Sequence, residues 1–140
     1  MGQGLQRTGV GPVILNHRRA ETPFLQQVHE GAYDFTRFTE SGHRWLFRTF
    51  DAIDSGVVLG PGSQLLWSIE HVVRGTFRSV TAGVLVKMLL FWLRYFDALI
   101  PERYASDAAS AVYFLGRKSE TAIQPRDMIA YYKGAHARTK

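Results

Sequence analysis

The sequence predicts a mixed α/β fold, in which two long helices are inserted between the strands of an incomplete sheet. Two segments, Phe50–Leu59 and residues 107–116, have the composition or the alternation typical of strands. The segment between them repeats apolar residues at helical spacing. Because two strands rarely form a stable sheet by themselves, we expect this sheet to need further strands.

Length and composition indicate one folded domain. The chain has 140 residues, of which 46% are hydrophobic and 21% charged, and these proportions are typical of globular proteins. It has no cysteine, which excludes disulfides, thiolate metal sites and a cysteine nucleophile. The lack of cysteine fits a reducing compartment, and we expect a cytoplasmic protein.

The net charge of +5 resides in the two ends of the chain. Residues 1–20 carry a net +3 and residues 117–140 a net +4, whereas residues 21–116 carry −2. Nucleic-acid binders usually show a basic stripe on the folded body, so we expect no binding to nucleic acid. Glycines and Pro12 make residues 1–20 a flexible leader. Its glycine pairs lack the preceding strand and following helix that a cofactor-binding loop needs.

Residues 22–40 show no clean period and predict an ordered loop with short turns. Thr39 or Ser41 is expected to cap a following helix. The buried side of that helix is expected to carry Trp45, Leu46 and Phe50.

Phe50–Leu59 predicts a strand, with a possible bulge marked by Ser55 and Gly56. Ser63 is expected to cap the next helix. The apolar face of this helix would carry Leu65, Leu66, Ile69, Val72, Val73 and Phe77.

Residues 80–100, from Val80 to Ile100, form the most apolar segment and predict one continuous helix. Sixteen of its 21 residues are hydrophobic, and the polar exceptions fall on one narrow stripe: Gly83, Lys87, Arg94 and Asp97. The favoured interpretation is a core or partner-covering helix with a solvated stripe. Peripheral contact with a membrane surface is an open alternative. A membrane span is disfavoured, because each internal charge costs about 2.5–3.5 kcal/mol near the bilayer centre.

Residues 107–116 alternate two fairly apolar faces and predict an interior strand. Residues 119–140 are expected to form a short basic C-terminal helix, starting at Pro125 and ending near Lys133, followed by a tail.

Two stretches resemble a known family. One runs from the end of a strand into a loop, and the other is the apolar segment near the C-terminus. The first consists of Glu21-Thr22-Pro23-Phe24 and of His29-Glu30-Gly31-Ala32-Tyr33-Asp34-Phe35-Thr36-Arg37-Phe38-Thr39. The second consists of Ala108-Ala109-Ser110-Ala111-Val112-Tyr113-Phe114-Leu115-Gly116-Arg117-Lys118. Together they resemble the C-terminal part of class I S-adenosylmethionine-dependent methyltransferases of the type-11 kind, over about residues 21–118.

The resemblance implies a partial Rossmann-like methyltransferase sheet. Phe50–Leu59 would be its sixth strand, and residues 107–116 its seventh, which pairs antiparallel. The cofactor implied is S-adenosylmethionine. The family's glycine loop and acidic ribose-binding residue would lie before residue 21, and the leader does not resemble them. The chain is therefore expected to be truncated and inactive alone, whether through a natural truncation or a mis-set start.

The resemblance places four candidate residues near the methyl acceptor. His29 would act as a proton acceptor, because its unperturbed pKa is ~6.5, and Tyr33 would orient the acceptor. Asp34 and Arg37 would bind the substrate, with Arg37 holding a carboxylate or phosphate. The alternative is a structural loop in which Arg37 pairs with Asp34. The remaining histidines show no spacing typical of metal ligands.

Two functions stay open. The first is a methyltransferase-derived unit whose acceptor is a small or lipid-linked molecule. The second is a non-catalytic module that uses its apolar helices at a membrane surface or on a protein partner. Exposed apolar residues on an incomplete sheet also predict self-association.

Overall fold

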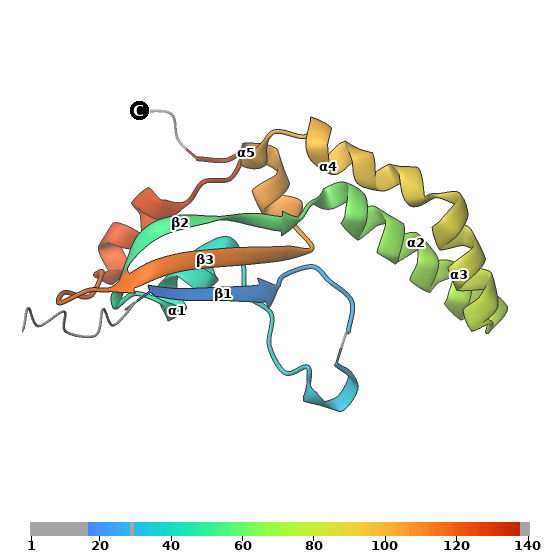
Figure 1. The fold of residues 1–140 in the computed structure, drawn as a ribbon, viewed down its shortest axis with the longest axis horizontal. Coiled ribbons are helices and arrows are strands. Elements are labelled where there is room, and N and C mark those ends of the chain that lie inside the picture. The colour runs from blue at the N-terminus through green and yellow to red at the C-terminus, as the bar shows by residue number, and fades with distance from the viewer. Residues whose placement is uncertain (1–16, 29, 138–140) are drawn as a thin grey trace, which may run out of the picture.

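The computed structural model describes residues 17–28 and 30–137, which form a mixed α/β fold around a three-stranded antiparallel sheet (Figure 1). The strands are β1 (His17–Pro23), β2 (Phe50–Leu59) and β3 (Ala111–Lys118). Their order is β1-β3-β2, so the last strand in sequence is the central one. The predicted α/β class is confirmed, and the two long helices do lie between β2 and β3 in the chain.

The central strand β3 supplies much of the core. Val112 and Phe114 are 0% and 1% exposed, which confirms the prediction of an interior strand. Its predicted start was wrong, because residues 106–108 form a short 3₁₀ turn before the strand begins at Ala111. Asp107 cannot extend the strand, since its carboxylate accepts hydrogen bonds from the C-terminal segment.

Strand β1 corrects the expected loop at residues 17–20. This stretch pairs with β3, with His17 opposite Arg117 and Ala20 opposite Phe114. Local pattern did not reveal it, because an edge strand with charged, exposed side chains lacks the apolar alternation that identifies a half-buried strand. The rest of the expected leader, residues 1–16, lies outside the described residues.

Strand β2 has the predicted bounds, but its irregularities lie elsewhere than expected. The register against β3 shifts between Ala52 and Asp54 and again between Val57 and Leu59. Ser55 and Gly56 pair regularly with Phe114 and Tyr113, so the bulge predicted there is wrong. Gly56 instead gives room for the side chains of Glu102 and Tyr113.

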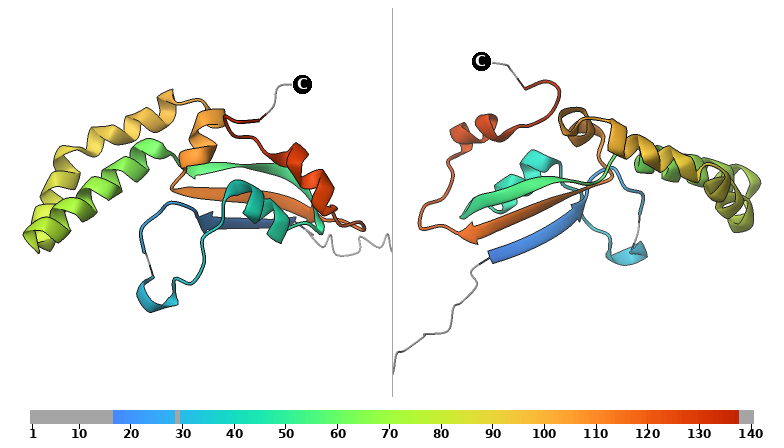
Figure 2. Two further views of the ribbon diagram at one scale, coloured as in Figure 1. Left: turned by 180° about the vertical axis from the view of Figure 1, so that it is seen from behind. Right: turned by 45° about the horizontal axis from the view of Figure 1, so that its top comes forward.

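Helix α1 (Glu40–Leu46) lies against one face of the sheet (Figure 2). Thr39 caps it as predicted, accepting a hydrogen bond from the Gly42 N–H at 3.0 Å. The expected buried side was wrong: Trp45 and Leu46 are 37% and 49% exposed.

The buried side of α1 is polar in composition. His43 is 1% and Arg44 3% exposed. The His43 ring packs on Phe47 and Phe114, and the Arg44 guanidinium donates to the Phe47 and Phe50 carbonyls. Aromatic packing on His43 and the two hydrogen bonds from Arg44 stabilise this orientation of α1, while His43 Nε2 and Arg44 Nε are buried without a hydrogen-bond partner.

Two helices form a hairpin that extends away from the sheet, as Figures 1 and 2 show. Helix α2 (Pro61–Phe77) packs against α3 (Val80–Leu89), and the chain returns through a 3₁₀ turn, η2 (Phe91–Tyr95), and α4 (Phe96–Leu99). The expected continuous helix over residues 80–100 is therefore broken.

The break has a packing reason. The turn buries Leu93, which is 7% exposed, and brings Asp97 to the start of α2, where it accepts hydrogen bonds from Gly62 and Ser63. Ser63 is thus not the cap that the sequence suggested; Gly60 precedes the helix, and Asp97 supplies the acceptor.

The remaining elements are short. They are η1 (Gly31–Tyr33), α5 (Glu102–Ala105), η3 (Ser106–Ala108) and η4 (Pro125–Tyr131). The predicted C-terminal helix begins at Pro125 as expected but is a 3₁₀ helix that stops at Tyr131. It stops there because Tyr132 is extended and its hydroxyl donates to Asp107.

Candidate functional site

A large cavity lies at one end of the sheet. Because β1 and β2 are each antiparallel to β3, they run parallel to one another, and their carboxyl ends meet at the same edge. A cavity of about 640 Å³ opens there. It is lined by the ends of both strands, the loop that follows β1, the start of β3, and Trp67 of α2. The volume is in the usual range for a small-molecule site.

The lining of this strand-end cavity combines carboxylates with aromatic rings. The carboxylates belong to Glu21, Glu30 and Asp34, and the rings to Tyr33, Phe35 and Trp67. Among the described residues that line it, none is basic. Carboxylates attract cations, and the faces of aromatic rings do so as well. The cavity therefore suits a positively charged group better than a phosphate or a carboxylate.

Two of the lining carboxylates already have cationic neighbours. Glu21 accepts from Arg19 at 2.7 Å in an exposed pair, and Asp34 pairs with Arg37. Each arginine offsets the charge of its carboxylate, and both arginines lie outside the lining of the cavity.

Arg37 links several residues of the loop after β1 through hydrogen bonds. Its Nη2 donates to Asp34 Oδ2 at 2.6 Å and its Nη1 to Asp34 Oδ1. It also donates to the carbonyls of Gln26, Gln27 and Thr36. Five bonds match the five N–H groups of a guanidinium, and the bond to Asp34 raises the pKa of Arg37.

The candidate residues from the sequence are thus partly brought together. Tyr33 and Asp34 line the strand-end cavity, and Arg37 braces the loop behind it. The pairing expected of a structural loop is present. Substrate binding by Arg37 stays a prediction, and it would require Arg37 to release one of its present acceptors. His29 lies outside the described residues.

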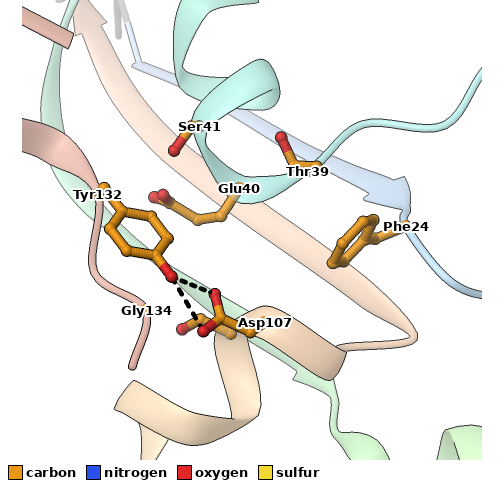
Figure 3. Close-up of a pocket in the computed structure, with 8 residues that line it drawn as sticks. Phe24, Thr39, Glu40, Ser41, Asp107, Tyr132 and Gly134 are labelled. Carbon is orange, nitrogen blue, oxygen red and sulfur yellow. Dashed lines mark hydrogen bonds between the residues drawn. The ribbon is translucent and has the colours of Figure 1, made fainter. Parts of the chain in front are cut away.

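A second, smaller pocket of about 200 Å³ lies where α1 meets the C-terminal segment (Figure 3). Glu40 lines it and is 8% exposed. Its Oε1 accepts from Ser55 Oγ at 3.4 Å, while Oε2 is buried without a hydrogen-bond partner. Burial raises the pKa of Glu40, and nearby Lys133 opposes that rise.

The other polar groups of this pocket hold the C-terminal segment in place. Asp107 accepts from the Tyr132 hydroxyl at 2.8 and 3.0 Å (Figure 3). It also accepts from the Ala135 N–H at 2.9 Å. The bond to Asp107 raises the pKa of Tyr132. Asp107 and Tyr132 thus join the C-terminal segment to the body of the fold, whereas Glu40 Oε2 in the same pocket has no hydrogen-bond partner. Sequence reasoning missed it, since Glu40, Asp107 and Tyr132 are far apart in the chain and share no motif.

In the described part of the chain, no cluster of three or more histidine, aspartate or glutamate side chains is arranged to hold a metal ion. None of the helices in that part has the length and hydropathy to cross a membrane.

Comparison with family models, curated proteins and solved structures finds no match to this chain.

Proposed function

We propose that this chain forms the acceptor side of a methyltransferase-like unit, and that the strand-end cavity is where the methyl acceptor meets the methyl donor. The observation that carries the proposal is the chemistry of the cavity: three carboxylates and three aromatic rings, with no basic residue among the described lining. The sulfonium of S-adenosylmethionine is a cation, and so is an amine acceptor at neutral pH. Both suit such a lining.

The topology supports the proposal. The resemblance expects a last strand that pairs antiparallel into the sheet, and β3 is antiparallel to both of its neighbours. It also expects the segment from Tyr33 to Thr39 to follow a strand and border the acceptor. That segment follows β1, and its first four residues line the cavity.

The fit to the donor is partial. When bound, S-adenosylmethionine supplies an electrophilic methyl group. Tyr33, Trp67 and Glu30 suit its charged sulfonium end, whereas the resemblance assigns the adenosine to a glycine loop that it places before residue 21. We therefore expect weak donor binding by this chain.

The roles of the chain's own residues follow from their positions. The Tyr33 side chain is 78% exposed and the Phe35 side chain 83%, so both rings are free to close over a ligand. Arg37 holds the loop at the cavity edge. His29 is proposed, on the resemblance, as the base that takes a proton from the acceptor. The acceptor class is a small or lipid-linked amine.

Calorimetric titration tests the proposal. We expect weak, saturable binding of S-adenosylmethionine at one site. S-adenosylhomocysteine, which lacks the charge, should bind roughly 2- to 30-fold more weakly, given about 0.5–2 kcal/mol for a cation–π contact. Trp67→Leu and Glu30→Gln should each weaken the binding of S-adenosylmethionine. The difference in affinity between S-adenosylmethionine and S-adenosylhomocysteine should therefore be smaller in these variants. Glu120→Gln, at an exposed carboxylate outside the cavity, is the matched control. Equal binding of the two ligands, or no saturation, would contradict the proposal.

A further inference from the structure

The polar stripe of residues 80–100 faces the other helix of the hairpin. Gly83 lies against Arg74 and the Glu70 backbone, where an added Cβ would meet the Arg74 Cβ at 3.1 Å. Lys87 Nζ forms an ion pair with Glu70 Oε2 at 2.8 Å. Asp97 accepts hydrogen bonds at the start of α2. Three of the four polar positions expected to be solvated are thus engaged inside the hairpin.

The opposite side of the same segment is therefore apolar and open to solvent. It carries apolar residues of α3, η2 and α4, each at least half exposed, which we call the hairpin face: Leu85, Met88, Leu89, Trp92, Tyr95 and Leu99. The hairpin that carries them extends beyond the sheet (Figures 1 and 2). An apolar stripe this long on a protein surface is typical of a docking site.

The charges on the outer part of the hairpin have one sign. Residues 71–96 contain Arg74, Arg78, Lys87 and Arg94 and no acidic residue. The three arginines are exposed. Contact between the hairpins of two copies would bring these like charges near one another, which is unfavourable. A surface that is apolar in its interior and negative at its boundary complements both features.

We propose that the hairpin face docks in the plane of an anionic lipid bilayer. The leucines and Met88 would enter the acyl boundary, Trp92 and Tyr95 would lie at headgroup level, and the exposed arginines would contact anionic headgroups. The arrangement needs no membrane span. It does not rest on the proposed function, because the strand-end cavity takes no part in it.

Vesicle flotation tests the docking. The full chain is mixed with vesicles of phosphatidylcholine alone or of phosphatidylcholine with phosphatidylserine. We expect it to float with the mixed vesicles and to be released by salt. Arg78→Gln with Arg94→Gln should weaken binding roughly 30-fold, since each basic residue near an anionic surface contributes about one kilocalorie per mole. Leu89→Ser with Trp92→Ser should abolish it.

The control pair is Ile129→Ser with Arg126→Gln, because both side chains are highly exposed on η4 and neither belongs to the hairpin. It should float like the wild type, and circular dichroism checks that all variants fold. The proposal is overturned if the wild type ignores anionic vesicles, or if the two hairpin pairs and the control pair bind alike. It is also overturned if sedimentation shows a dimer that Leu89→Ser dissolves, since a second copy would then cover the face.

Discussion

Asp97 is expected to fix the base of the hairpin, and its replacement should destabilise the protein measurably. Its carboxylate accepts from the Gly62 N–H at 2.7 Å, from the Ser63 N–H at 3.2 Å and from the Ser63 hydroxyl at 2.6 Å. Asp97→Ala removes this acceptor from the first turn of α2. Loss of a cap costs about 0.5–2 kcal/mol, and loss of a negative charge at a helix N-terminus about 0.3–1 kcal/mol more.

We therefore expect the free energy of unfolding to fall by about 1–3 kcal/mol in Asp97→Ala, measured by urea titration. The midpoint of thermal unfolding should fall by about 3–10 °C. Asp97→Asn keeps an acceptor and loses the charge, so it should cost about 1 kcal/mol. Asp127→Ala, at an exposed residue with a loose 3.8 Å ion pair, is the control. If Asp97→Ala stays within about 0.5 kcal/mol of this control, the capping argument is wrong.

Three further predictions concern buried or bridging polar groups. Arg37→Ala should lower the free energy of unfolding by about 1.5–3 kcal/mol and speed proteolysis of the loop after β1, whereas Arg126→Ala should do neither. Burial lowers the pKa of His43, so the folded state binds fewer protons, and stability should fall as pH drops from about 6.5; a wild-type slope equal to that of His43→Leu would refute this. Burial raises the pKa of Glu40, so its contribution to stability is present below about pH 4.3 and is lost as pH rises through its folded-state pKa. Urea titrations of Glu40→Gln should lack that loss, and a wild type that gains stability relative to this variant over the same range would contradict the assignment.

The sequence predicted those elements whose own residues show a pattern typical of a strand or of a helix cap. Phe50–Leu59 has its observed bounds, and Thr39 caps α1. Strand β1 was missed because its strand state comes from pairing with β3 rather than from apolar alternation. The break after Leu89 was missed because no proline or glycine marks it; burial of Leu93 produces it.

The hairpin shows what a periodic pattern leaves undecided. The period located the polar stripe, but the prediction that this stripe faces solvent was wrong. Glu70 decides this, because it pairs with Lys87 and turns the stripe inward. Such a pairing depends on how α2 and α3 pack, which helical spacing within one segment does not contain.

The candidate site was predictable to a similar extent. A motif in one loop placed Tyr33 and Asp34 beside a cavity, because neighbours in sequence stay neighbours in a short loop. The alternative of a structural loop anticipated the pairing of Arg37 with Asp34. The motif did not indicate that Arg37 would also donate to three backbone carbonyls, nor that Trp67 from a distant helix would complete the lining.

The most direct test of the central claim is where the donor binds. Amide and indole shifts of ¹⁵N-labelled protein are followed during titration with S-adenosylmethionine and with S-adenosylhomocysteine. S-adenosylmethionine is expected to shift the amide resonances of Tyr33 and Phe35 and the indole resonance of Trp67 most. S-adenosylhomocysteine is expected to shift them much less. Shifts confined to the Glu40 pocket or to the hairpin, equal responses to both ligands, or no shifts at all would contradict a cation-binding cavity at the carboxyl ends of β1 and β2.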